Sequence, residues 1–76
     1  MESTLYLLND NIHTFDEVIS TLRKHFGYSL LHGTSIASIV HQNGRCGIKN
    51  GYFEELEPLK ESFMHDGFNV TIENKI

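Results

Sequence analysis

The stretch LYLLNDNIHTFDEVI, residues 5–19, passes from an apolar segment to an amphipathic one through the polar junction NDNIH, residues 9–13. The apolar residues from Thr4 to Leu8 predict a short strand. Asn and Asp side chains bond readily to nearby backbone, so the junction has the chemistry of a turn. The stretch therefore predicts a strand that leads directly into a helix.

That helix has clear start and stop signals. Thr14 and Glu17 have the spacing of a capping box, and Gly27 follows the last apolar position as a helix stop. The apolar residues between them form one stripe at helical spacing: Phe15, Val18, Ile19, Leu22 and Phe26.

The rest of the chain predicts one more helix, a strand, a third helix and a last strand. A second helix is expected from near Ser29 to His41, where the letters QNG follow, and it would pair with the first. The segment RCGIK, residues 45–49, has strand character, and Asn50-Gly51 favours a hairpin turn.

The third helix is expected to begin with an acidic first turn that contains Pro58, and to end before Gly67. Alternation of apolar and polar residues then predicts a last strand over FNVTIE, residues 68–73. The order is βααβαβ. We predict one α+β domain over residues 1–76, in which a mainly antiparallel three-stranded sheet packs against three helices. Residues 1–4 are expected to be a short disordered N-terminus.

Composition narrows the function classes. Six basic and ten acidic residues give a formal charge of −4, and no basic cluster exceeds a pair, so nucleic acid is a poor partner. No apolar run is long enough to span a bilayer, and one cysteine forms no internal disulfide. We expect a cytoplasmic monomer that does not bind membranes.

Catalytic and metal sites are not favoured. The five histidines and the single Cys46 show no metal-ligand spacing, and a lone cysteine in a strand is more often core packing than a nucleophile. We therefore expect no metal, no cofactor and no enzymatic activity.

His41 closes an apolar helix face and has two interpretations. It could be a C-terminal histidine that the helix dipole favours. Alternatively, it could converge with the junction residues as a set of hydrogen-bond acceptors.

Several motifs resemble those of the ClpS family, the adaptors of the ATP-dependent Clp protease that recognise N-degrons. LLNDN resembles the family's apolar residues followed by Asn-Asp-Asp, and FDEVI resembles the start of its first helix. IVH, followed by G and CG, resembles the end of the second helix and the next strand. The resemblance covers nearly the whole chain and implies the βααβαβ fold, which the ribosomal stalk protein's C-terminal domain shares.

The resemblance also implies a ligand and its site. The family binds the free α-amine and the large hydrophobic first residue of a peptide, here Phe, Leu, Tyr or Trp. Carried over by motif, the amine-binding residues are Asn9, Asp10, Asn11 and His41. The pocket residues are Leu8, His13, Phe15, Val18, Ala37, Val40 and Phe68. A protonated amine offers three donors and no acceptor, which suits a cluster of acceptors.

The chain departs from the family pattern around this site. Asn11 replaces a second acidic residue, and His13-Thr14 stands where Thr-Pro is common. Phe15 and Ala37 replace methionines, and Phe68 replaces a frequent leucine, so the pocket is expected to have a changed shape.

The resemblance implies a non-enzymatic adaptor that presents N-degron proteins to a ClpA- or ClpC-like AAA+ unfoldase. Glu55 and Lys60 have a spacing that resembles the family's docking helix. The short segment before the first strand keeps an alternative open, in which the domain binds the unfoldase or another partner as an inhibitor or modulator. A third possibility is a small structural module without a ligand site.

Overall fold

The computed structural model describes residues 2–74 and confirms the predicted order of elements. These are β1 (Glu2–Leu8), α1 (Phe15–Phe26), α2 (Leu30–Asn43), β2 (Arg45–Tyr52), α3 (Phe53–His65) and β3 (Asn69–Asn74). The strands form one sheet in the order β2-β1-β3, and both neighbouring pairs are antiparallel. The α+β prediction is therefore correct.

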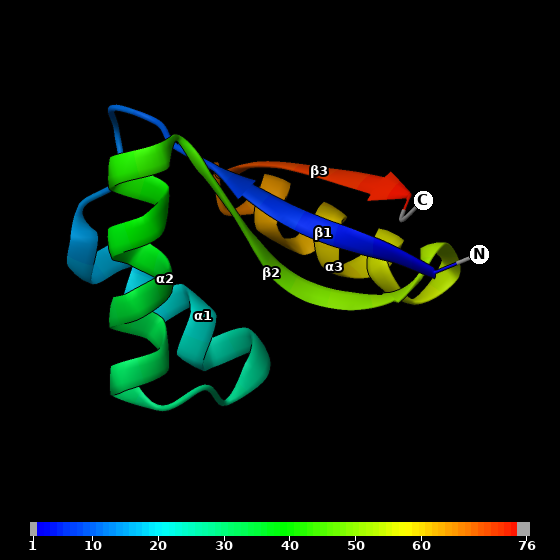
Figure 1. Ribbon diagram of the computed structural model, residues 1–76, viewed down its shortest axis with the longest axis horizontal. Helices are drawn as coiled ribbons and strands as arrows, with labels where there is room; N and C mark the ends of the chain where they lie inside the picture. The colour runs from blue at the N-terminus through cyan, green and yellow to red at the C-terminus, as the bar shows by residue number, and fades with distance from the viewer. Residues whose placement is uncertain (1, 75–76) are drawn as a thin grey trace.

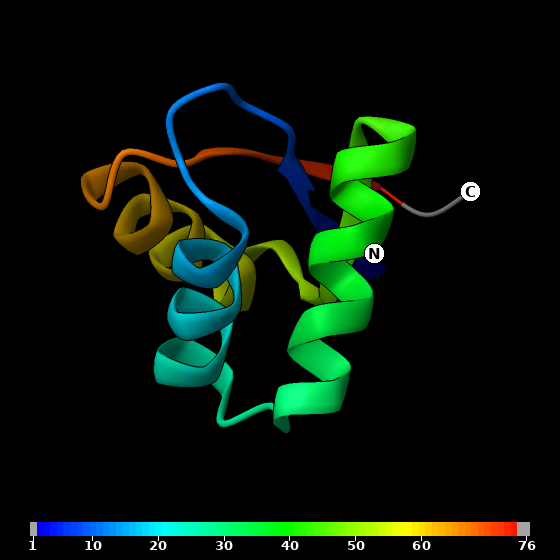
Figure 2. The same ribbon diagram turned by 90° about the vertical axis from the view of Figure 1, so that its left-hand side faces the viewer.

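The helices cover the sheet unequally. α3 lies along one face and contacts all three strands, whereas α1 and α2 form a separate pair at one end of the sheet (Figure 1). Seen from that end, the two helices stand side by side, and the junction between β1 and α1 loops over the start of α1 (Figure 2). This arrangement places the junction at the end of the sheet where the helix pair begins.

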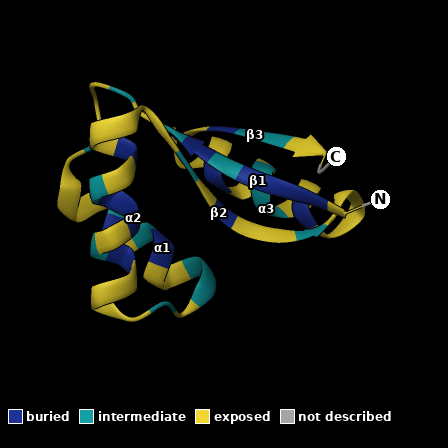
Figure 3. Ribbon diagram, in the orientation of Figure 1, coloured by how far each residue is buried: buried dark blue, intermediate teal, exposed yellow. Residues whose placement is uncertain are grey.

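The core lies between the sheet, α3 and the helix pair, where Figure 3 shows the buried positions. Alternation along β1 buries Leu5 and Leu7 on the side that faces α3. The other buried members of this core cluster come from every remaining element or its margin: Leu22, Ile36, Val40, Ile48, Leu56, Phe63, Phe68 and Val70.

β1 and β2 are both longer than predicted. Glu2 and Ser3 were expected to lie in a disordered N-terminus of about four residues, but they belong to β1, where Ser3 and Thr4 are buried. Their partners on β2 are Gly51 and Asn50, which continue the strand and form no hairpin turn. The two errors have one cause, because each strand extension provides the backbone partners of the other.

The helix boundaries agree with the predicted ones at α1 and differ modestly from them at α2 and α3. Thr14 and Glu17 form the predicted capping box, and Gly27 ends α1 with a positive φ of 68°. α2 extends past His41 to Asn43 and ends at Gly44, whose φ is 88°. Pro58 lies inside α3 and not in its first turn. No helix within residues 2–74 has the length and apolar character that crossing a membrane requires.

Candidate functional site

A cavity of about 310 Å³ lies where the junction meets the first turn of α1 and the last turns of α2. Its volume is at the lower end of the range for small-molecule pockets. The structure brings nine of the predicted site residues together around it: Asn9, Asp10, Asn11, His13, Phe15, Val18, Ala37, Val40 and His41.

Local structure fixes the walls of this cavity. The backbone N–H of Asn9 donates to the carbonyl of Gly44 at 2.8 Å, which ties the start of the junction to the end of α2. On α2, Ala37 and Val40 are buried, and His41 lies on the same face because residues three and four positions apart are neighbours on a helix. The cavity thus has an apolar side from both helices and a polar side from the junction and His41.

The Asp10 carboxylate organises the junction. Its Oδ1 accepts hydrogen bonds from the backbone N–H groups of Ile12 and His13, both at 2.8 Å, and its Oδ2 lies 2.9 Å from His13 Nδ1. Burial alone would raise the pKa of Asp10, but these bonds from His13 and Ile12 outweigh it, so the pKa lies below its ordinary value. Asp10 is therefore a fixed negative charge beside the cavity.

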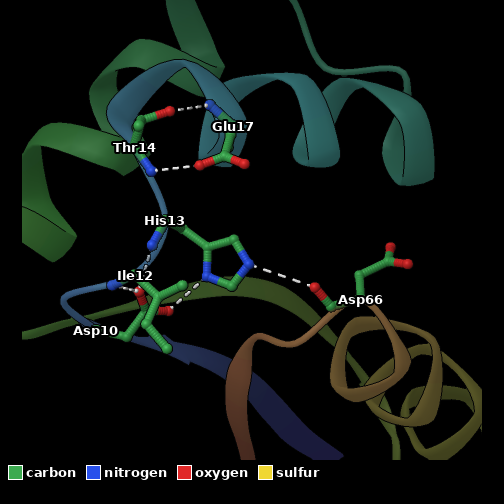
Figure 4. A network of polar contacts seen from close by, with 6 residues as sticks. All are labelled: Asp10, Ile12, His13, Thr14, Glu17 and Asp66. Atoms are coloured by element: carbon green, nitrogen blue, oxygen red, sulfur yellow. Dashed lines mark hydrogen bonds and ion pairs between the residues drawn. The ribbon is translucent and has the colours of Figure 1, made fainter.

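His13 joins the junction to the corner between α3 and β3 (Figure 4). Its Nε2 lies 3.3 Å from the carbonyl oxygen of Asp66, and its ring stacks on Phe68 with centroids 3.8 Å apart. The hydrogen bond to Asp10 raises the pKa of His13 against the opposing effect of burial. His13 is thus both a wall of the cavity and part of a hydrogen-bond network.

Other polar groups of the cavity are open to a ligand. Within the described chain, the side chains of Asn9, Asn11 and His41 have no hydrogen-bond or ion-pair partner, and all three residues are exposed. Amide carbonyl oxygens and a neutral imidazole nitrogen accept hydrogen bonds. Together with Asp10 they can receive a group that carries several donors and a positive charge.

Two predicted pocket residues lie elsewhere. Leu8 follows the buried Leu7, so strand alternation directs it to the opposite face of the sheet, and it does not line the cavity. Phe68 is 5% exposed and does not line the cavity either, because its ring packs against His13 and, edge to face, against Phe63. Phe68 therefore supports the wall from behind His13.

The two predicted docking residues lie on α3. Glu55 is exposed, and its Oε1 accepts a hydrogen bond from the Tyr52 backbone N–H at 3.2 Å, which caps the helix. Lys60 is half-buried. Neither residue lines the cavity, so any docking role would be separate from ligand binding.

Sequence reasoning missed the contribution of Asp66. This residue lies 53 positions from His13, and its carbonyl is the acceptor, so no side-chain motif marks the contact. The Asp66 side chain has a second histidine partner, since His25 Nε2 lies 3.3 Å from Asp66 Oδ2. Over residues 2–74, no three histidine, cysteine or acidic side chains gather in a way that could hold a metal.

Comparisons with known proteins place this geometry in context. The family model described as ATP-dependent Clp protease adaptor protein ClpS matches residues 2–71. The E3 ubiquitin-protein ligase UBR1 of Drosophila melanogaster is 39% identical over 56 residues, which are 74% of this chain and 3% of that protein. The chain thus spans a small fraction of this relative.

A solved structure has the same fold. Agrobacterium tumefaciens ClpS2, bound to L-phenylalaninamide, matches with a TM-score of 0.82 over 97% of this chain and 96% of that one. Sequence identity is 18%, so the match concerns the fold.

Proposed function

Since the chain belongs to the ClpS family of ATP-dependent Clp protease adaptor proteins, we propose that it captures proteins by a free N-terminal amine and a large hydrophobic first residue. The function is binding and not catalysis. We further propose that the bound proteins are presented to a ClpA- or ClpC-like AAA+ unfoldase for degradation.

One observation carries the binding proposal: unpaired acceptors and apolar side chains share a single cavity. Asn9, Asn11 and His41 offer acceptors beside the ionised Asp10, and an ammonium group has three donors and a positive charge to match them. The apolar side of the cavity, which includes Val18, Ala37 and Val40, would hold the first side chain. The ligand of the ClpS2 structure, L-phenylalaninamide, has both of the groups that this cavity would hold, a free α-amine and a large apolar side chain.

Calorimetric titration with a short peptide that begins with Phe tests this proposal, and the same peptide with an acetylated N-terminus is the control. Acetylation removes the charge and two of the three donors. Because the acceptors would then lose charge-assisted partners, affinity should fall by about a hundredfold or more. Equal affinity for the two peptides would contradict the amine-binding role.

Presentation of bound proteins to the unfoldase needs a separate experiment, because peptide binding does not imply it. A fluorescent reporter with N-terminal Phe should be degraded faster by a ClpA- or ClpC-containing protease when this protein is added. Glu55→Lys and Lys60→Glu should reduce this acceleration and leave peptide affinity unchanged, because neither residue lines the cavity. Slower degradation despite peptide binding would instead identify an inhibitor or modulator.

A further inference from the structure

Both ring nitrogens of His13 face oxygen acceptors. Nδ1 lies 2.9 Å from the Asp10 carboxylate, and Nε2 lies 3.3 Å from the Asp66 carbonyl. A carbonyl oxygen donates no hydrogen bond, and neither does an ionised carboxylate. A neutral imidazole has one N–H and satisfies one of them, whereas the imidazolium satisfies both. The geometry therefore favours the charged form of His13.

The place of the ring connects this charge to ligand binding. His13 lines the cavity, and the side chains of His13 and Asp10 are 13% and 11% exposed, so water screens their interaction less than at an open surface. The ring also contacts the Asp66 carbonyl and Phe68, which belong to the corner between α3 and β3. His13 is thus the side chain through which that corner supports the cavity.

We propose that His13 is a positioning residue of the binding site, which holds the Asp10 carboxylate beside the ligand's amine and, when charged, offsets its negative charge. The inference rests on the proposed function, because it concerns how the same site recognises an amine. Loss of the His13 proton leaves the Nδ1–H donor on Asp10 and removes the positive charge. The attraction of Asp10 for a cationic amine should then increase.

Proton binding to His13 and amine binding should therefore oppose each other. By linkage, the amine should lower the pKa of His13 by the amount that the proton weakens amine affinity. The bond to Asp10 raises the pKa of His13 in the free protein, and the charge of Glu17 on α1 acts in the same direction. Two ionisable residues near the His13 ring, Asp10 and His41, line the cavity described above. His13 also lines a second cavity of about 530 Å³, whose other ionisable residues are Asp16, Glu17, Lys24 and Asp66.

Two variants separate positioning from charge. His13→Phe keeps a ring that can stack on Phe68 and removes both donors. His13→Asn keeps an N–H donor near the Nδ1 position and carries no charge. Both variants retain His41, so its contribution to amine binding is common to them and the wild type.

Affinity for a peptide that begins with Phe should be measured by calorimetry between pH 5.5 and 7.0, where the α-amine stays charged. We expect His13→Phe to bind about threefold to tenfold more weakly than His13→Asn at every pH, because only the latter keeps a side-chain donor for Asp10 Oδ2. Wild-type affinity should rise between pH 5.5 and 7.0 by about threefold more than that of His13→Asn, because only the wild type loses a positive charge at position 13.

The outcomes are distinguishable. Equal affinities of the two variants would overturn the positioning role, and equal pH profiles of wild type and His13→Asn would overturn the charge effect. If the wild type binds no peptide, the proposed function fails and the inference fails with it. His25→Phe is the matched control, since His25 contacts the same Asp66 but does not line the cavity, and its affinity should equal that of the wild type.

NMR titration of the histidine rings provides a readout that a purely structural role would not change. The His13 midpoint should lie above about pH 6.5, the ordinary value for histidine, and should fall in Asp10→Asn. Saturating peptide should also lower it in the wild type. A His13 midpoint that neither Asp10→Asn nor the peptide moves would contradict the inference.

Discussion

Two networks of charged side chains lie at the sheet, and they differ in what surrounds them. At the junction, Asp10 and His13 are nearly buried and border a cavity with unpaired acceptors. On the face of the sheet away from α3, Arg45 donates two hydrogen bonds to Glu73, at 2.9 and 2.8 Å, and lies 3.9 Å from the centroid of the Tyr6 ring. Arg45 and Glu73 are 44% and 45% exposed.

The comparison teaches where to look for binding. The Arg45 network joins all three strands, and its charges are paired with each other, so it leaves little for a ligand to satisfy. The junction network instead fixes one carboxylate beside acceptors that have no partner in the described chain. Unpaired acceptors around a cavity, and not charge alone, distinguish the proposed binding site.

The largest expected effect is the loss of an unpaired acceptor. His41→Ala should reduce affinity for a free N-terminal peptide about tenfold to a hundredfold, since a hydrogen bond to a charged group contributes about 1.5–3 kcal/mol. Calorimetric titration measures this change. His32→Ala is a control on the same helix, because His32 stacks on Tyr28 outside the cavity. If both variants lost the same affinity, His41 would have no specific role.

The apolar wall should control specificity rather than overall affinity. Ala37 is 3% exposed and lines the cavity, so Ala37→Met should occupy space that a first side chain needs. Peptides that begin with Trp should lose affinity relative to those that begin with Leu, by about 1–3 kcal/mol. Titrations with Trp, Phe, Tyr and Leu peptides give the ranking. The exposed Ser35→Met should leave it unchanged, and the same ranking in Ala37→Met would remove Ala37 from the site.

These two predictions concern His41 and Ala37, which were assigned to the site before the structure was known. The junction residues, Ala37, Val40 and His41 were assigned to the site by the resemblance to the ClpS family. The elements that carry them have local signals of their own: a turn-forming cluster, a capping box and helical spacing. The fold was predictable for the same reason, since each element carries its own periodicity.

The roles of His13, Leu8 and Phe68 could not be predicted fully. His13 was expected to be only a pocket wall, because its bond to the Asp66 carbonyl depends on packing between segments 53 residues apart. Phe68 was assigned to the cavity by motif, but the imidazole of His13 stacks against it. A long-range contact that ends on a backbone atom leaves no pattern in side-chain types.

The junction network should also have a characteristic pH dependence of stability. Asp10 has a pKa below its ordinary value of 3.8, so its contribution is complete above that value and is lost as the pH falls through the folded value. His13 has a pKa above its ordinary value of 6.5, so its contribution is complete below that value and is lost as the pH rises through the folded value. The pair should therefore stabilise the fold most between these two ordinary values.

Thermal unfolding of wild type and Asp10→Asn across pH 3–8 measures this contribution. The difference in Tm should be greatest between about pH 4 and 6.5 and should decrease on both sides. Other carboxyls with lowered pKa values, such as Asp66 and Glu73, are present in both proteins and largely cancel in the difference. A difference that stays constant across this range would contradict the coupling of Asp10 and His13.

The smallest effect is expected on the open face of the sheet. Arg45→Gln removes both bonds to Glu73, but these charges are exposed and water screens them, so Tm should fall only slightly. Salt should reduce the difference further, because the Debye length at about 1 M salt is only about 3 Å and interactions between exposed charges are strongly screened. Peptide affinity should not change, since Arg45 lies outside the cavity. A loss of affinity in Arg45→Gln would show that the two networks are coupled, because β1 carries Tyr6 and leads directly into the junction.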